Sequence, residues 1–188
     1  MKKYFITYLL LCSLAVLAQD KPKPPLTWKD VGAWKAIPAF NGTQLSSDGA
    51  WFAYVLNPNE GDAELILRKT GDTTKIKYPL GSSTSFSMNF SDDAKWFAFK
   101  VYPKDKDKKA AAKPGGKPVP DKVFLINLTN KKKTEFERVR SFAFNGEKSS
   151  VLALQLTPAN APGGPNADGP KGSDLLLYDL AGGKTQNI

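Results

Sequence analysis

Short segments in which apolar positions recur every second residue run along most of the chain, a pattern that favours β-strands over helices. The clearest segments combine aromatic, leucine and β-branched residues: Trp51–Tyr54, Ala63–Lys69, Trp96–Phe99, Lys122–Leu128, Val151–Leu154 and Asp174–Leu180. Such residues suit the pleated surface of a buried sheet. The polar clusters between them are rich in Asp, Asn, Gly and Ser, which are typical of tight turns. The pattern therefore predicts an all-β protein built from antiparallel hairpins.

One sequence motif, a polar turn followed by an apolar strand, recurs along the chain. Its three copies are Ser46–Tyr54 (SSDGAWFAY), Ser91–Phe99 (SDDAKWFAF) and the weaker Asn145–Leu154 (NGEKSSVLAL). Trp51 aligns with Trp96, and Val151 takes the corresponding place in the third copy. A second hairpin follows each copy, so each unit contains four short strands.

Four-stranded units that recur about every 40–50 residues are the signature of β-propeller blades. We expect a partial β-propeller of about three four-stranded antiparallel blades, the third incomplete, over 27–188, with blades at approximately 40–82, 84–138 and 140–188. Two connections, 102–121 and 157–172, are longer and are expected to be mobile surface insertions. A generic antiparallel sandwich would explain the strands but not the recurring turn-Trp-Phe-Ala register.

Three units are too few to close a propeller, which needs at least four blades. They would leave open edge strands and a one-sided apolar face. We therefore expect the protein to continue beyond Ile188 or to be completed by another chain, and we favour a fragment of a longer protein.

The N-terminal residues have the three parts of a signal peptide. Lys2 and Lys3 precede an apolar stretch, and Val16–Ala18 fits the small-residue cleavage rule. We predict a signal peptide over 1–18, an extended linker over 19–26, and a periplasmic or secreted protein with no stable membrane insertion after cleavage. A membrane anchor is the alternative, but the stretch is shorter than the roughly 20 apolar residues that a bilayer span needs.

The chemistry open to this chain is limited because it contains no histidine. Ser-His-Asp and Cys-His catalysis both need an imidazole that takes a proton near neutral pH. The single cysteine, Cys12, falls in the predicted leader, which excludes disulfides and cysteine-ligated metals from the mature chain. We therefore predict no catalytic, cofactor-binding or metal-binding residue in this chain.

Two sets of residues nonetheless suggest sites. Asp48, Asp92 and Asp93 are interpreted as turn residues, because a calcium loop needs several oxygen ligands at tight spacing. Trp51 and Trp96 are interpreted as blade core rather than as surfaces on which a ligand stacks.

The net charge is +9, and much of the excess lies in the runs 104–109 and 131–133. Basic runs can bind phosphates or membranes. Without aromatic interleaving or a nucleic-acid motif, we interpret these runs as solvated loops and turns, and we expect no nucleic-acid partner. The role of the lysine-rich insertion 104–120 stays open.

A preface segment, Leu26–Trp34 (LTWKDVGAW), stands between the leader and the first blade motif. This order of leader, preface and Ser46–Tyr54 motif resembles the N-terminus of large exported prolyl oligopeptidase-type serine peptidases of Bacteroidetes-like bacteria. The resemblance implies an N-terminal propeller that screens a C-terminal α/β-hydrolase domain and admits only peptides and unstructured segments. The nucleophile, acid and histidine of the family belong to that hydrolase domain.

No Gly-x-Ser-x-Gly elbow occurs in this chain, so no catalytic residue is carried over. We expect a non-catalytic segment of a serine-type peptidase, whose peptide substrates would be met through the absent catalytic domain. The alternative is a periplasmic TolB-like propeller that binds or scaffolds a partner without peptidase activity.

Overall fold

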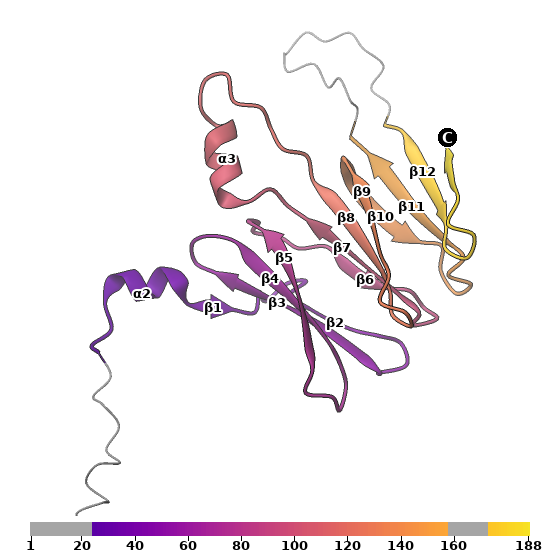
Figure 1. The fold of residues 1–188 in the computed structure, drawn as a ribbon, viewed down its shortest axis with the longest axis horizontal. Helices are drawn as coiled ribbons and strands as arrows, with labels where there is room; N and C mark the ends of the chain where they lie inside the picture. Colours follow the sequence, from indigo (N-terminus) through magenta and orange to yellow (C-terminus); the bar gives the residue numbers. More distant parts are fainter. Residues whose placement is uncertain (1–23, 158–172) are drawn as a thin grey trace, which may run out of the picture. The chain divides into compact units, whose positions relative to one another are not determined.

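The computed structural model describes residues 24–157 and 173–188 (Figure 1). The predicted signal peptide, most of the predicted linker and nearly all of the 157–172 insertion lie outside the described residues. The chain divides into two units, 1–31 and 32–188. In the part of the chain that the structure describes, no helix is long and apolar enough to cross a membrane.

The described end of the N-terminal unit leads into the short helix α2 (Trp28–Ala33). Asp30 Oδ2 accepts hydrogen bonds from the backbone N–H and the hydroxyl of Thr27, at 2.6 and 2.8 Å. This contact satisfies the N–H that precedes the helix, as in a capping box. The side chain of Trp28 is exposed.

Residues 35–187 form three antiparallel sheets in chain order. The first contains β2 (Thr43–Leu45), β3 (Trp51–Pro58), β4 (Ala63–Lys69) and β5 (Lys75–Gly81). The second contains β6 (Met88–Phe90), β7 (Trp96–Val101), β8 (Lys122–Asn127) and β9 (Lys133–Glu137). The third contains β10 (Val139–Phe144), β11 (Val151–Leu156), β12 (Leu175–Asp179) and β13 (Thr185–Asn187). The expected all-β architecture of three antiparallel four-stranded units is confirmed, and the third sheet, expected to be incomplete, contains four strands, the last of them short.

The first sheet has one strand more than expected. The two-residue strand β1 (Lys35–Ala36) pairs with the end of β3 at Asn57 and Pro58. β1 directly follows the preface segment, and an ion pair of 2.8 Å from Lys35 Nζ to Glu64 Oε2 crosses to β4. Both contacts extend the first sheet beyond the four strands that the sequence predicted.

The repeated polar turns hold the second strand of each sheet in register. Ser46 Oγ accepts the N–H of Trp51 at 2.9 Å and donates to Asp48 Oδ1 at 2.6 Å. Ser91 Oγ makes the same two bonds to Trp96 and Asp93. Both serines are buried, so each replaces lost water contacts with two protein partners.

The third turn reaches the same result with different residues. Asn145 Oδ1 accepts the N–H groups of Ser150 and Val151, at 2.9 and 3.0 Å. The Asn145 side chain thus binds the two N–H groups that a serine and an aspartate bind in each of the first two turns. Trp51, Trp96 and Val151 each begin the second strand of a sheet, as the repeat predicted.

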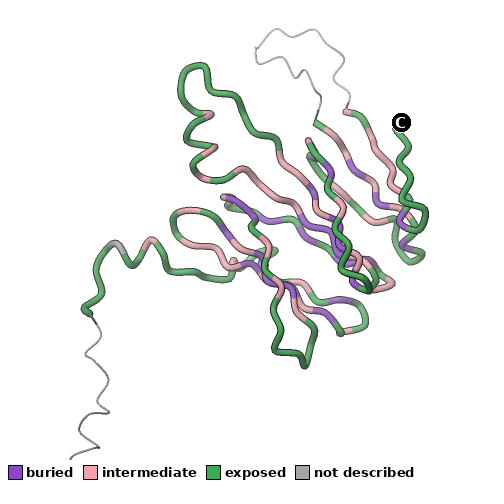
Figure 2. Tube along the Cα trace, in the orientation of Figure 1, coloured by how far each residue is buried: buried purple, intermediate pink, exposed green. Residues whose placement is uncertain are grey.

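The first two sheets share one apolar core. Trp51, Ala53 and Val55 of β3 are buried in the same cluster as Phe97 and Phe99 of β7. These are alternate positions on their strands, and successive side chains on a strand point to opposite faces. Figure 2 shows that the buried positions are concentrated on the strands.

The second and third sheets share a separate core. Ala98, which lies between Phe97 and Phe99, belongs to a cluster with Leu152 and Leu154 of β11. The second sheet therefore presents its phenylalanines to the preceding sheet and its alanine face to the following one. We call these the rear and forward faces of a sheet.

The insertion at 102–121, expected to be a mobile surface connection, contains the helix α3 (Asp105–Ala111). None of its residues is buried, and Lys109 pairs with Asp105 one turn away at 2.6 Å. The N–H of Asp105 donates to Asp62 Oδ1 of the first sheet at 2.8 Å, and Lys108 donates to the Ser82 carbonyl. Lys and Ala are good helix formers, so a run interpreted as a solvated loop supports a helix once its first turn is anchored.

The connection before α3 passes closely over the end of β5. The N–H of Tyr102 donates to the Leu80 carbonyl at 2.8 Å, and the N–H of Ser82 donates to the Pro103 carbonyl at 3.0 Å. Between them Gly81 has a φ of +73°, and a Cβ there would lie 2.1 Å from the Tyr102 oxygen. Only glycine fits this approach.

We predict that Gly81→Ala lowers the free energy of unfolding by about 2–5 kcal/mol, from a left-handed backbone cost of ~1–2 and a crowding cost of ~1–3 kcal/mol. Gly71→Ala is the matched control, because Gly71 has a φ of +82° but open space around its Cβ position. Urea denaturation of both variants measures the difference. Equal losses would show that the close approach contributes nothing.

Candidate functional site

Two of the three aspartates that suggested a cation site accept hydrogen bonds within their own turns, and the third accepts one from the first turn. Asp48 Oδ1 accepts the N–H of Ala50 at 3.0 Å, and Asp93 Oδ1 accepts the N–H of Lys95 at 3.2 Å. The carbonyl of Asp92 accepts the Ser47 hydroxyl at 2.6 Å. Within 24–157 and 173–188, no group of three or more Cys, Asp or Glu side chains is placed to hold a metal ion.

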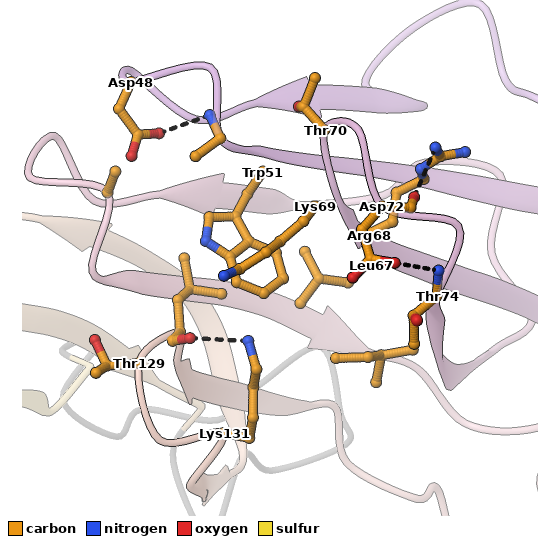
Figure 3. Close-up of a pocket in the computed structure, with 14 residues that line it drawn as sticks. Asp48, Trp51, Leu67, Arg68, Lys69, Thr70, Asp72, Thr74, Thr129 and Lys131 are labelled. Carbon is orange, nitrogen blue, oxygen red and sulfur yellow. Dashed lines mark hydrogen bonds between the residues drawn. The ribbon is translucent and has the colours of Figure 1, made fainter.

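A groove of about 670 Å³ lies where the first two sheets meet, beside the turns that follow β4 and β8 (Figure 3). Its apolar lining comes from both sheets: Trp51, Leu67, Ile76 and Leu128. Lys69, at the end of β4, and Lys131, in the turn between β8 and β9, also line it. The groove therefore combines an apolar floor with basic groups.

Both lysines approach the indole of Trp51. The Nζ of Lys131 lies 3.6 Å from the ring centroid, and the Nζ of Lys69 lies 5.4 Å from it. Lys131 Nζ also donates to the Leu128 carbonyl at 2.8 Å, a bond visible in Figure 3. An ammonium group over an aromatic face is attracted by the negative charge of that face. Trp51 is thus core on one side, as expected, and the base of a cationic groove on the other.

Arg68, Asp48 and Asp72 line the groove together with the two lysines, so the lining holds three basic and two acidic side chains. Among the described residues, no ion pair joins either lysine to a carboxylate. Asp72 Oδ1 accepts the N–H of Thr74 at 2.8 Å, and this bond, together with the nearby charge of Lys69, lowers the pKa of Asp72. Partial burial lowers the pKa of Lys131, and the nearby charge of Lys69 lowers it further. The groove therefore carries a small excess of positive charge.

The run 131–133 is exposed, as expected for a solvated turn, and two of its lysines also lie over aromatic rings. Lys131 lies over Trp51, and the Nζ of Lys133 lies 4.0 Å from the ring centroid of Phe124. The lysine–tryptophan contact joins two sheets and has no local signal in the sequence. The run 104–109, also interpreted as solvated, contributes most of α3.

Two apolar sheet faces belong to neither core cluster. On the rear face of the first sheet, Phe52 and Tyr54 are half-buried, with ring centroids 5.6 Å apart. On the forward face of the third sheet, Ala153 and Leu177 are half-buried cross-strand partners. In the second sheet, by contrast, both faces belong to a core: one packs against the first sheet and the other against the third.

No protein-family model matches this chain, and no curated protein matches it. Solved structures do show similar folds. The β-propeller domain of the Trilobed protease from Pyrococcus furiosus has a TM-score of 0.48 at 16% identity, over 74% of this chain and 39% of that one. Pyrococcus horikoshii acylaminoacyl peptidase has a TM-score of 0.46 at 14% identity, over 74% of this chain and 23% of that one.

A third similar structure, Kuenenia stuttgartiensis hydrazine synthase, has a TM-score of 0.43 at 13% identity, over 78% of this chain and 41% of that one. The chain therefore spans less than half the length of each of these three proteins. At these identities and TM-scores, we take nothing about activity from them.

The Asp48 turn predicts a loss of stability in acid. The hydrogen bond from Ser46, and then that from the Ala50 N–H, hold the pKa of Asp48 below its ordinary value. A lowered pKa stabilises the fold above the ordinary value near about 4, and this contribution is lost as the pH falls through the folded-state pKa. Asp48→Asn should therefore lose less stability than the wild type between about pH 6 and about pH 3.

Urea denaturation at both pH values measures this difference. Glu147→Gln serves as the control, since Glu147 is an exposed carboxylate with no hydrogen bond or ion pair among the described residues. An Asp48→Asn variant with the same pH dependence as the wild type would exclude a role for the Asp48 charge in the turn.

Proposed function

We propose that this chain is the non-catalytic opening part of a propeller in an exported serine peptidase, and that it restricts the access of substrates to a catalytic domain in the remainder of the protein. The observation that carries the proposal is that the forward face of one sheet packs against the rear face of the next, both between the first two sheets and between the second and third. The second sheet is covered on both faces, while the first and third each retain one apolar face outside the two cores. Further blades of the same kind would cover these two faces.

The absence of histidine supports a non-catalytic role for this segment, because hydrolysis by a serine triad needs an imidazole base. The peptidase assignment itself rests on the resemblance of Leu26–Trp34 and of the blade motif to exported prolyl oligopeptidase-type enzymes. Export rests on the leader pattern of residues 1–18. Under this proposal, peptides reach the catalytic domain only through the propeller.

A fluorophosphonate probe, which reacts with activated serines, tests the peptidase assignment. The native protein is isolated with an antibody against residues 24–188 and then treated with the probe. We expect a labelled polypeptide larger than the 20.5 kDa of this chain, and no label on the 188-residue chain expressed alone. A longer native protein that takes no label, and whose sequence continues with blades only, would instead support a TolB-like binding propeller.

The proposed restriction of access is tested in that longer protein by loosening the contact between the first two sheets. Phe97 is fully buried in their shared core, and Phe97→Ala is expected to destabilise it by about 3–5 kcal/mol. We expect cleavage of a folded protein substrate to rise several-fold relative to cleavage of a short peptide. Ser141→Ala, at an exposed site on β10, is the control, and an unchanged ratio in Phe97→Ala would refute the restriction.

A further inference from the structure

The groove over Trp51 can be compared with a second groove at the equivalent place in the same chain. A second groove, of about 360 Å³, lies between the second and third sheets and is lined by Trp96, the counterpart of Trp51. In the first groove Trp51 pairs across the strands with Lys69, and in the second Trp96 pairs with Asn127. Lys69 therefore has no basic counterpart in the second groove, although Lys132 lines that groove from another position.

The position of Lys131 is likewise occupied by a different residue type in the second groove. Leu128 and Leu180 are equivalent, because their N–H groups donate to the residues that precede β7 and β11, at 2.8 and 2.9 Å. Three positions later stand Lys131 and Gly183, whose N–H groups both donate to a carbonyl four residues back at 2.8 Å. Where the first groove has a lysine, the second has a glycine.

This position disfavours a lysine. Lys131 has a φ of +63° and Gly183 a φ of +67°, in the left-handed region that glycine adopts without cost. Placing a side chain there is unfavourable. Partial burial and the nearby charge of Lys69 also lower the pKa of Lys131, which disfavours its charged form. The formation of the turn does not require this lysine, since the equivalent turn forms with glycine.

We propose that the groove over Trp51 binds a carboxylate attached to an apolar group, such as the C-terminus of a peptide that ends in an apolar residue. Lys69 and Lys131 hold the carboxylate, and the apolar group lies on Trp51, Leu67 and Leu128. A bound carboxylate pairs with the two ammonium groups, neither of which forms an ion pair among the described residues. The inference is independent of the proposed function, because every residue involved belongs to the two sheets described.

The acidic residues at the groove narrow the class of ligand. Asp48 and Asp72 line it together with the lysines. Their charges disfavour a doubly charged phosphate or a nucleic-acid backbone relative to a singly charged carboxylate, since repulsion grows with the charge of the ligand. The apolar floor further favours an organic acid over a small inorganic anion.

Isothermal titration of the full chain with N-acetyl-phenylalanine tests the proposal, and N-acetyl-phenylalaninamide is the matched ligand without the negative charge. We expect the acid to bind about tenfold more tightly than the amide, as for a charge-assisted contact. Inorganic phosphate is the third probe. Equal affinities of acid and amide, no binding of the acid, or binding of phosphate as tight as that of the acid would each overturn the proposal.

Substitutions locate the site. Lys69→Gln and Lys131→Gln are each expected to weaken binding of the acid about five- to tenfold. Lys131→Gly should do the same while keeping the fold, because the third sheet has Gly183 at this position. Lys131→Arg should retain binding, and Lys75→Gln, an exposed lysine on β5 outside the groove, should leave it unchanged. Unaltered affinity in both Lys69→Gln and Lys131→Gly would also overturn the proposal.

Discussion

The register of the second strand in each sheet is the constraint on which the rest of the structure depends. A slip of one residue would exchange the two faces of that strand, because successive side chains point to opposite sides. The polar turn before the strand prevents the slip by binding the N–H of its first residue, with Ser46 at Trp51 and Ser91 at Trp96. Two buried hydroxyl groups thus determine which side chains meet the neighbouring sheet.

With the register fixed, the sheets fit together through side-chain size. The forward faces carry small residues at Ala53 and Ala98, and the rear face of the second sheet presents Phe97 and Phe99. Small side chains let the neighbouring sheet approach, and large ones opposite fill the space at the density of a protein interior. The turns add polar contacts along the same interfaces: the Ser47 hydroxyl donates to the Asp92 carbonyl at 2.6 Å.

The features that the sequence predicted depend on neighbours in the chain. The alternation of apolar and polar residues identified the strands, and the turn residues identified the hairpins that connect them, because both signals are local. Strand β1 and helix α3 were missed because each forms through distant partners: β1 pairs with the end of β3, and α3 is anchored by Asp62. The groove was missed for the same reason, since Lys69 and Lys131 lie in different sheets and meet only at Trp51.

A repeat protein separates the requirements of folding from those of binding, because equivalent positions face the same folding problem. Where the copies agree, as at the serines of the first two turns, the shared residue serves the fold. Lys131 and Gly183 are equivalent positions at which the copies differ, and the lysine occupies a left-handed backbone conformation that favours glycine. The formation of the turn does not account for this difference. The left-handed turn forms with glycine in one copy and tolerates a charged side chain in the other. The cost of that lysine therefore points to a role outside the sheet, in what the groove over Trp51 contacts.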